Sequence, residues 1–126
     1  MKTHTMALLA GIAIGATAVQ GLSAQTAKPK AYSVGELEIL DAAAQADYLP
    51  AARKAIDAAH GHALRTAAGR VVLIEGTPAP KSAAIVEWDS VDDAVAFYKS
   101  KAWTDLAPAR DKATKAVRRY VVEVEK

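Results

Sequence analysis

Four side chains in this sequence have the chemistry to move a proton or to bind an anion: Glu75, Glu87, Tyr98 and Arg110. A carboxylate whose pKa is raised by burial can accept a proton, and a phenol can donate a hydrogen bond. A guanidinium is rarely buried without a carboxylate or an anionic ligand beside it. We expect Glu75 or Glu87 to pair with Arg110 in a structural salt bridge. Recognition of an anion or carboxylate ligand by Arg110 is the alternative.

Three large aromatic side chains, Trp88, Tyr98 and Trp103, lie close together in the sequence. Packed in a core, each would stabilise the fold by about 1.5–3 kcal/mol. As pocket walls they would offer an apolar surface to a flat ligand. A core role is favoured, because a small domain usually places its aromatic side chains in its core. Together with Arg110, these three residues are the ligand-binding candidates.

Other signals for chemistry are weak or absent. His60 and His62 are two positions apart, and an extended turn could aim both at zinc or iron. The sequence leaves this open, and we assign no metal ligand. The chain has no cysteine, which excludes disulfides and thiolate chemistry. It has no phosphate-binding, dinucleotide-binding, nucleophile-elbow or zinc-protease motif, so we expect no bound cofactor.

The elements that must position these residues follow a regular order. Two helices are expected, one beginning after an N-cap at Asp41 and one after an N-cap at Ser90. Pro50 predicts a kink in the first helix or a later start, and Gly61 is expected to end it. The predicted strands are Tyr32–Ile39, Val71–Glu75, Ala83–Trp88 and Tyr120–Glu125. This β-α-β-β-α-β order predicts an α+β, ferredoxin-like fold with a four-stranded antiparallel sheet.

Alternation along the strands predicts which side chains share a face of the sheet. If the helices cover Leu37, Val86, Val122 and Val124, every strand glutamate falls on the opposite face. The apolar part of that face would be near the limit that a monomer exposes. A two-fold homodimer, sheet against sheet, would cover it. The alternative is a face that simply contacts water.

The N-terminal residues have the features of a secretory signal peptide. Lys2 precedes the apolar run Met6–Val19, which is too short to span a bilayer, and small residues follow up to Ala24. We predict a signal peptide over residues 1–24, a flexible lead-in over 25–30 and one domain over 31–126. The expected location is periplasmic or secreted, with no membrane contact after cleavage; an uncleaved anchor is the alternative.

Charge gives no sign of nucleic-acid binding. The chain has 16 Lys and Arg against 14 Asp and Glu, a net charge of +2, and the two signs are interspersed. Nucleic-acid binding requires a basic face, which the sequence does not predict.

A resemblance extends these predictions from about Tyr32 to Glu125. It is carried by a motif set comprising Glu75-Gly76, Pro80, the strand Ile85–Trp88, Ala94, Tyr98-Lys99-Ser100, Trp103 and Arg110. In these residues the chain resembles the uncharacterised family known as domain of unknown function 1330. That family resembles the dimeric α/β barrel superfamily, whose members pair two ferredoxin-like sheets and include small monooxygenases, isomerases and haem-related enzymes.

The resemblance and the residues together predict an exported homodimer that binds a small aromatic or carboxylate-bearing molecule. One alternative is a cofactor-independent oxygenase or isomerase, in which Glu87 or Glu75 accepts a proton, Tyr98 donates a hydrogen bond and Arg110 stabilises an anion. Another is a structural dimer module without a ligand. Whether the protein is an enzyme stays open at this point.

Overall fold

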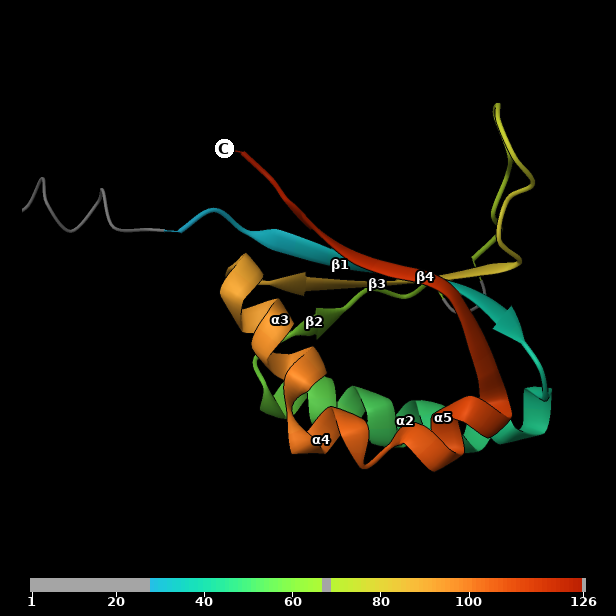
Figure 1. The fold of residues 1–126 in the computed structure, drawn as a ribbon, viewed down its shortest axis with the longest axis horizontal. Helices are drawn as coiled ribbons and strands as arrows, with labels where there is room; N and C mark the ends of the chain where they lie inside the picture. Colours follow the sequence, from blue (N-terminus) through green and yellow to red (C-terminus); the bar gives the residue numbers. More distant parts are fainter. Residues whose placement is uncertain (1–27, 67–68, 126) are drawn as a thin grey trace, which may run out of the picture.

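A sheet with helices on one of its faces makes up the fold (Figure 1). The computed structural model describes residues 28–66 and 69–125. The predicted signal peptide and residues 25–27 of the predicted lead-in lie outside these residues. The elements are β1 (Ala31–Ile39), α2 (Ala42–Ala58), β2 (His62–Ala63), β3 (Ser82–Trp88), α3 (Val91–Lys99), α4 (Lys101–Thr104), α5 (Ala107–Ala113) and β4 (Thr114–Glu123).

The sheet has the strand order β2-β3-β1-β4, and every neighbouring pair is antiparallel. β1 is therefore central, although it comes first in the chain. The helices lie on one side of the sheet (Figure 1), and we call the other side the open face. This arrangement confirms the predicted α+β, ferredoxin-like fold.

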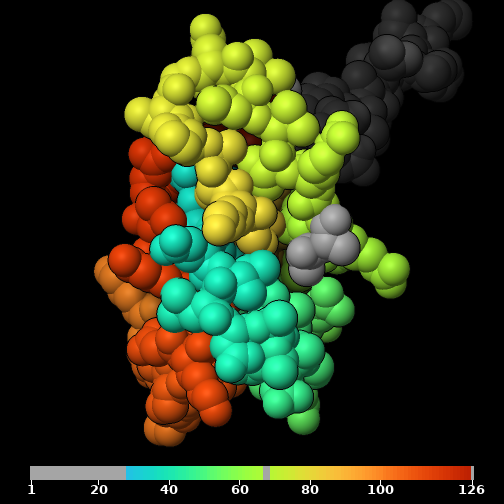
Figure 2. Space-filling model, turned by 90° about the vertical axis from the view of Figure 1, so that its right-hand side faces the viewer, coloured from blue at the N-terminus to red at the C-terminus, as the bar shows by residue number. Residues whose placement is uncertain are grey.

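The predicted strand Val71–Glu75 is wrong, because these residues have no regular secondary structure. The chain pairs with β3 directly after α2, through the two-residue β2 and a hydrogen bond from the Leu64 amide to the Ile85 carbonyl. The apolar run Val71–Ile74 then has no neighbouring strand, and Ile74 is 89% exposed. Residues 71–81 project from one end of the sheet (Figures 1 and 2). A β-favouring sequence alone does not make a strand without a pairing partner and cover for its side chains.

The prediction that Val122 and Val124 face the helices is wrong for β4. Val122 pairs with Tyr32 on the open face, whereas Val121 pairs with Ser33 and packs against the core. Glu123 lies opposite Ala31 on the helix side, so the strand glutamates do not all share one face. Because Val121 and Val122 are adjacent, the sequence does not show which of them faces the core. A register shift of one residue would exchange the two faces of the strand.

Helix starts follow the predicted caps. Asp41 accepts a hydrogen bond from the Ala44 amide at 2.9 Å, and Ser90 accepts one from the Asp93 amide at 3.1 Å. Both N-caps are confirmed. α2 begins at Ala42 with Pro50 inside it, so of the two outcomes expected from Pro50 the later start does not occur.

The end of α2 differs from the prediction. His60, with φ of 63°, adopts the left-handed conformation expected of Gly61. Gly61 has a different role, because a Cβ there would lie 2.7 Å from Cζ3 of Trp88. The glycine lets the end of the helix pack directly on the indole ring.

Two apolar clusters fill the space between sheet and helices. The larger joins six buried residues, namely Ile56, Val86, Trp88, Ala94, Phe97 and Trp103. The smaller joins Tyr48, Ala52 and Ala113. No helix in the described part of the chain is long and apolar enough to cross a membrane.

Candidate functional site

A cavity of about 90 Å³ lies between the helix-covered face of the sheet and α2. α2 contributes Tyr48, Ala52 and Ile56 to its wall, and β3 contributes Val86. Among the polar or aromatic groups that reach it from other elements are Tyr98 of α3, Trp103 of α4 and Arg119 of β4. Apolar walls with a few converging polar groups are typical of a small-molecule site.

Trp88 belongs to the core rather than to the cavity wall. Its side chain is almost completely buried at 1% exposure, and its Nε1 donates to Oγ of Ser33 at 3.0 Å. The same Oγ is 2.7 Å from the hydroxyl of Tyr98. Ser33 thus links the indole to the tyrosine that lines the cavity. This hydrogen-bond chain holds Tyr98 in place, because Ser33 lies on β1 and Trp88 lies on β3.

Arg110 does not form the predicted salt bridge. Its Nη1 donates to the Trp103 carbonyl at 3.0 Å, and its guanidinium lies 4.1 Å from the centroid of the Trp103 ring. Among the described residues it has no carboxylate partner. The predicted pairing with Glu75 or Glu87 is therefore wrong. Arg110 packs on the indole from outside the cavity wall.

Arg119 is the arginine that lines the cavity, and the sequence reasoning missed it. Its guanidinium lies 4.9 Å from the ring centroid of Trp103 and 5.4 Å from that of Tyr98. Arg119 pairs with Gly35 of β1, where a Cβ would meet its Nη1 at 3.0 Å. Gly35 in the middle of a central strand was the available signal, since a glycine there often marks a close approach.

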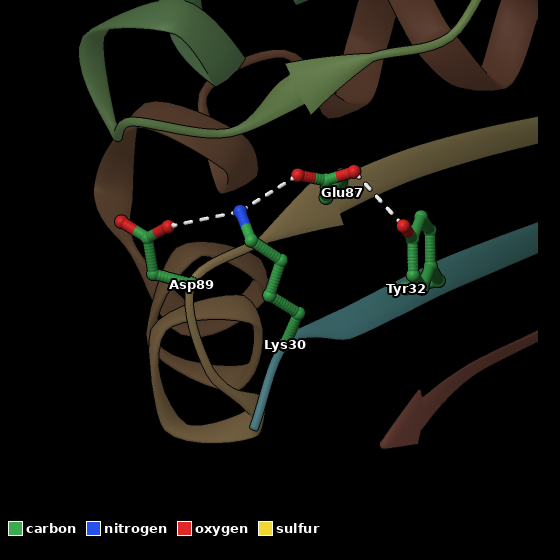
Figure 3. A network of polar contacts seen from close by, with 4 residues as sticks. All are labelled: Lys30, Tyr32, Glu87 and Asp89. Atoms are coloured by element: carbon green, nitrogen blue, oxygen red, sulfur yellow. Dashed lines mark hydrogen bonds and ion pairs between the residues drawn. The ribbon is translucent and has the colours of Figure 1, made fainter. Parts of the chain in front are cut away.

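Glu87 lies on the open face, away from the cavity, within a polar network (Figure 3). It accepts hydrogen bonds from Lys30 at 2.8 Å and from Tyr32 at 2.9 Å, and Lys30 also lies 3.7 Å from Asp89. The hydrogen bonds from Lys30 and Tyr32 lower the pKa of Glu87 below its usual value. A carboxylate held ionised in this way is a weak proton acceptor at neutral pH.

Glu75, the other glutamate candidate, lies in the segment between β2 and β3 and does not line the cavity. The structure therefore joins Tyr98 and Trp103 at one site, with Arg110 against the Trp103 ring. It places neither glutamate with them.

The two histidines are not brought together with acidic side chains to form a metal site. His62 pairs with Glu87 across β2 and β3, and His60 lies in the turn that follows α2. Within residues 28–66 and 69–125, no group of three or more histidine, aspartate or glutamate side chains could hold a metal ion.

Comparison with known proteins places the chain in a family. Residues 30–124 match the family described as Domain of unknown function (DUF1330). The chain belongs to this family. The resemblance inferred from the sequence is thereby confirmed. A search of curated proteins found no match for this DUF1330 protein.

Solved structures resemble this DUF1330 protein in fold. One is RPA0582, a protein of unknown function from Rhodopseudomonas palustris; it is 13% identical with a TM-score of 0.62, covering 90% of this chain and 96% of the other. Another is SnoaB, a cofactor-independent oxygenase from Streptomyces nogalater; it is 11% identical with a TM-score of 0.50, covering 78% and 95%. At such low identity the likeness concerns the fold alone.

Proposed function

We propose that this protein binds a small organic molecule in the cavity between its sheet and α2. The observation that supports this is the partly open pocket itself, since a concave, mostly apolar pocket with a few polar groups is typical of a small-molecule site. Its wall is largely apolar, and the polar groups of Tyr98 and Arg119 reach it. A dimer module without a ligand would be expected to fill this space with side chains.

Filling the cavity tests the proposal. Ala52 is buried and lines the cavity, so Ala52→Leu places a larger side chain in the space. Protein isolated from its own host is expected to carry a small-molecule adduct in native mass spectrometry, and Ala52→Leu to lose it. The overpacking itself should cost no more than about 1–3 kcal/mol.

The matched control is Ala51→Leu, one position earlier on the exposed side of α2. This variant is expected to retain the adduct. If the unsubstituted protein carries no adduct, and no fragment of a small-molecule library binds in ligand-observed NMR, the binding proposal fails.

Binding is a better-supported proposal than catalysis. SnoaB is an oxygenase, which keeps an oxygenase or isomerase reaction as the alternative. That alternative assigns proton transfer to Glu75 or Glu87, and neither lines the cavity that Tyr98 lines. The chain would therefore need another proton acceptor at the site.

We propose further that the protein works as a homodimer through its open face. On β4, Tyr120 and Val122 are 43% and 45% exposed, and Tyr32 and Val34 are their cross-strand partners on β1. These neighbours form an apolar stripe across two strands. Its position beside the Glu36–Arg118 pair gives both apolar and polar contacts for a second copy.

We also propose export, on the strength of the predicted signal peptide. N-terminal sequencing of the protein from the periplasmic fraction of its host is expected to begin at Gln25. Detection of an intact Met1 on the folded, cell-associated protein would contradict cleavage.

A further inference from the structure

The charge of the cavity wall is positive. The wall includes Arg53 and Arg119, and among the described residues it includes no aspartate or glutamate. Arg110 adds a third guanidinium nearby, on the Trp103 ring. Burial raises the pKa of the Tyr48 phenol, and the guanidinium groups of Arg110 and Arg119 oppose that shift. A site with this charge favours an anionic ligand over a neutral or cationic one.

Arg119 is the cation that most needs a partner. It is half-buried, and within the described residues it forms no ion pair and its side chain makes no hydrogen bond. A guanidinium in this position can present its N–H groups to a carboxylate in the forked geometry that arginine favours. The sheet makes room for it, because Gly35 leaves the space that a Cβ would occupy. Gly35 thus gives the Arg119 guanidinium a defined place in the cavity wall.

Arg118, which precedes Arg119 on β4, forms an ion pair with a carboxylate of the chain. It points to the open face, where its Nε and Nη2 donate to the two carboxylate oxygens of Glu36 at 2.8 and 2.9 Å. This is the forked geometry in which arginine recognises a carboxylate. On one strand, one arginine thus pairs with a carboxylate, while its neighbour pairs with none among the described residues.

The aromatic rings leave the hydrogen-bonding groups of Arg119 free. The guanidinium lies within cation–π distance of Tyr98 and Trp103. In the described part of the chain its N–H groups make no hydrogen bond with another side chain. The rings hold the guanidinium in place, and the N–H groups can still bind a carboxylate.

The size and lining of the cavity restrict the rest of the ligand. A volume of about 90 Å³ is several times the space that one water molecule needs in a cavity, and it suits only a small ligand group. Leu37, Ala52, Ile56 and Val86 supply an apolar wall. The ligand part inside the cavity must therefore be compact and apolar.

We infer that the ligand of this cavity is a carboxylate with a short apolar body, and that Arg119 binds its carboxylate group. This inference rests on the proposed binding function and names its ligand class. It also moves the anion-binding role from Arg110, where the sequence suggested it, to Arg119.

Butyrate and its neutral amide, butyramide, test the charge directly. Isothermal titration calorimetry on the full mature chain is expected to show butyrate binding at least about tenfold more tightly than butyramide, a difference of about 1.4 kcal/mol. Arg119→Gln should remove this preference, and Arg119→Lys should reduce it, since lysine keeps the charge without the forked geometry. Arg118→Gln is the matched control and should leave the preference unchanged.

A second variant guards against a failure of Arg119→Gln to fold. Gly35→Ala puts a methyl group against the Arg119 guanidinium and should weaken butyrate binding with little effect on butyramide. A merely structural role of Arg119 would weaken both compounds alike.

The outcomes separate the two proposals. Equal binding of butyrate and butyramide, unaffected by Arg119→Gln, would overturn the carboxylate inference and leave small-molecule binding standing. Absence of binding of both compounds up to about 10 mM, where even weak ligands register, would also overturn the inference. Small-molecule binding itself would fail only on the adduct and fragment experiments described above.

Discussion

Trp88→Ala is expected to lower the free energy of unfolding by about 3–5 kcal/mol. The indole is 1% exposed and its ring centroid lies 5.0 Å from that of Phe97. Its removal leaves a large void under Gly61, which packs against the ring. Because small domains have about 5–15 kcal/mol of stability in total, this variant should be close to unfolded at 37 °C. Urea denaturation followed by circular dichroism measures the change.

Ser33→Ala separates the hydrogen bond from the packing. It keeps the indole ring but removes the oxygen that Trp88 Nε1 and the Tyr98 hydroxyl share. The expected cost is about 1–3 kcal/mol, the penalty for buried polar groups left without a partner.

If Trp88→Ala instead changed stability by less than about 1 kcal/mol, Trp88 would not be a core residue, and its role as a ligand contact would return.

Local chemistry made the caps and the two inner strands predictable. Asp41 and Ser90 begin helices because their side chains satisfy free amides of the next turn, and this depends only on nearby residues. The strands β1 and β3 combine β-favouring residues with buried apolar side chains at Leu37, Val86 and Trp88. At these places the local preference and the final fold agree, so the sequence was sufficient.

The two wrong strand predictions depend on long-range strand pairing, which local sequence does not determine. Val71–Glu75 has the composition of a strand, but β3 pairs with the residues that follow α2 instead. The side of β4 depends on its register with β1, which adjacent valines do not determine. That register places Val121 and Arg119 on the helix side.

The same register decides how much of the site could be predicted. Tyr98 and Trp103 were correctly expected to lie near each other, because they are close in sequence and lie on the consecutive helices α3 and α4. Arg119 was missed, since its place in the cavity wall depends on the side of β4. Glu87 was expected beside Arg110, but Lys30 and Tyr32 are its partners across the open face. The residue types indicated an anion-binding arginine, but only the register of β4 determines that Arg119 is the arginine in the cavity wall.

Val122→Asp is expected to dissociate the proposed homodimer. Val122 lies on the open face beside Tyr32, and in a two-fold interface each substitution occurs twice, once from each subunit. Two unpaired carboxylates in an apolar contact would cost several kcal/mol in desolvation and repulsion. The dimer dissociation constant should therefore rise at least about 100-fold. Sedimentation equilibrium across a micromolar concentration series measures it.

Ala96→Asp is the matched control, because Ala96 is exposed on α3, on the opposite side of the sheet. This variant adds the same charge and should leave the dissociation constant unchanged. A monomeric mature chain at micromolar concentration would contradict the dimer itself. A Val122→Asp variant that still dimerises as tightly as the unsubstituted protein would place the interface on another surface. The three neighbouring exposed apolar residues Val72, Leu73 and Ile74 would then be the next surface to test.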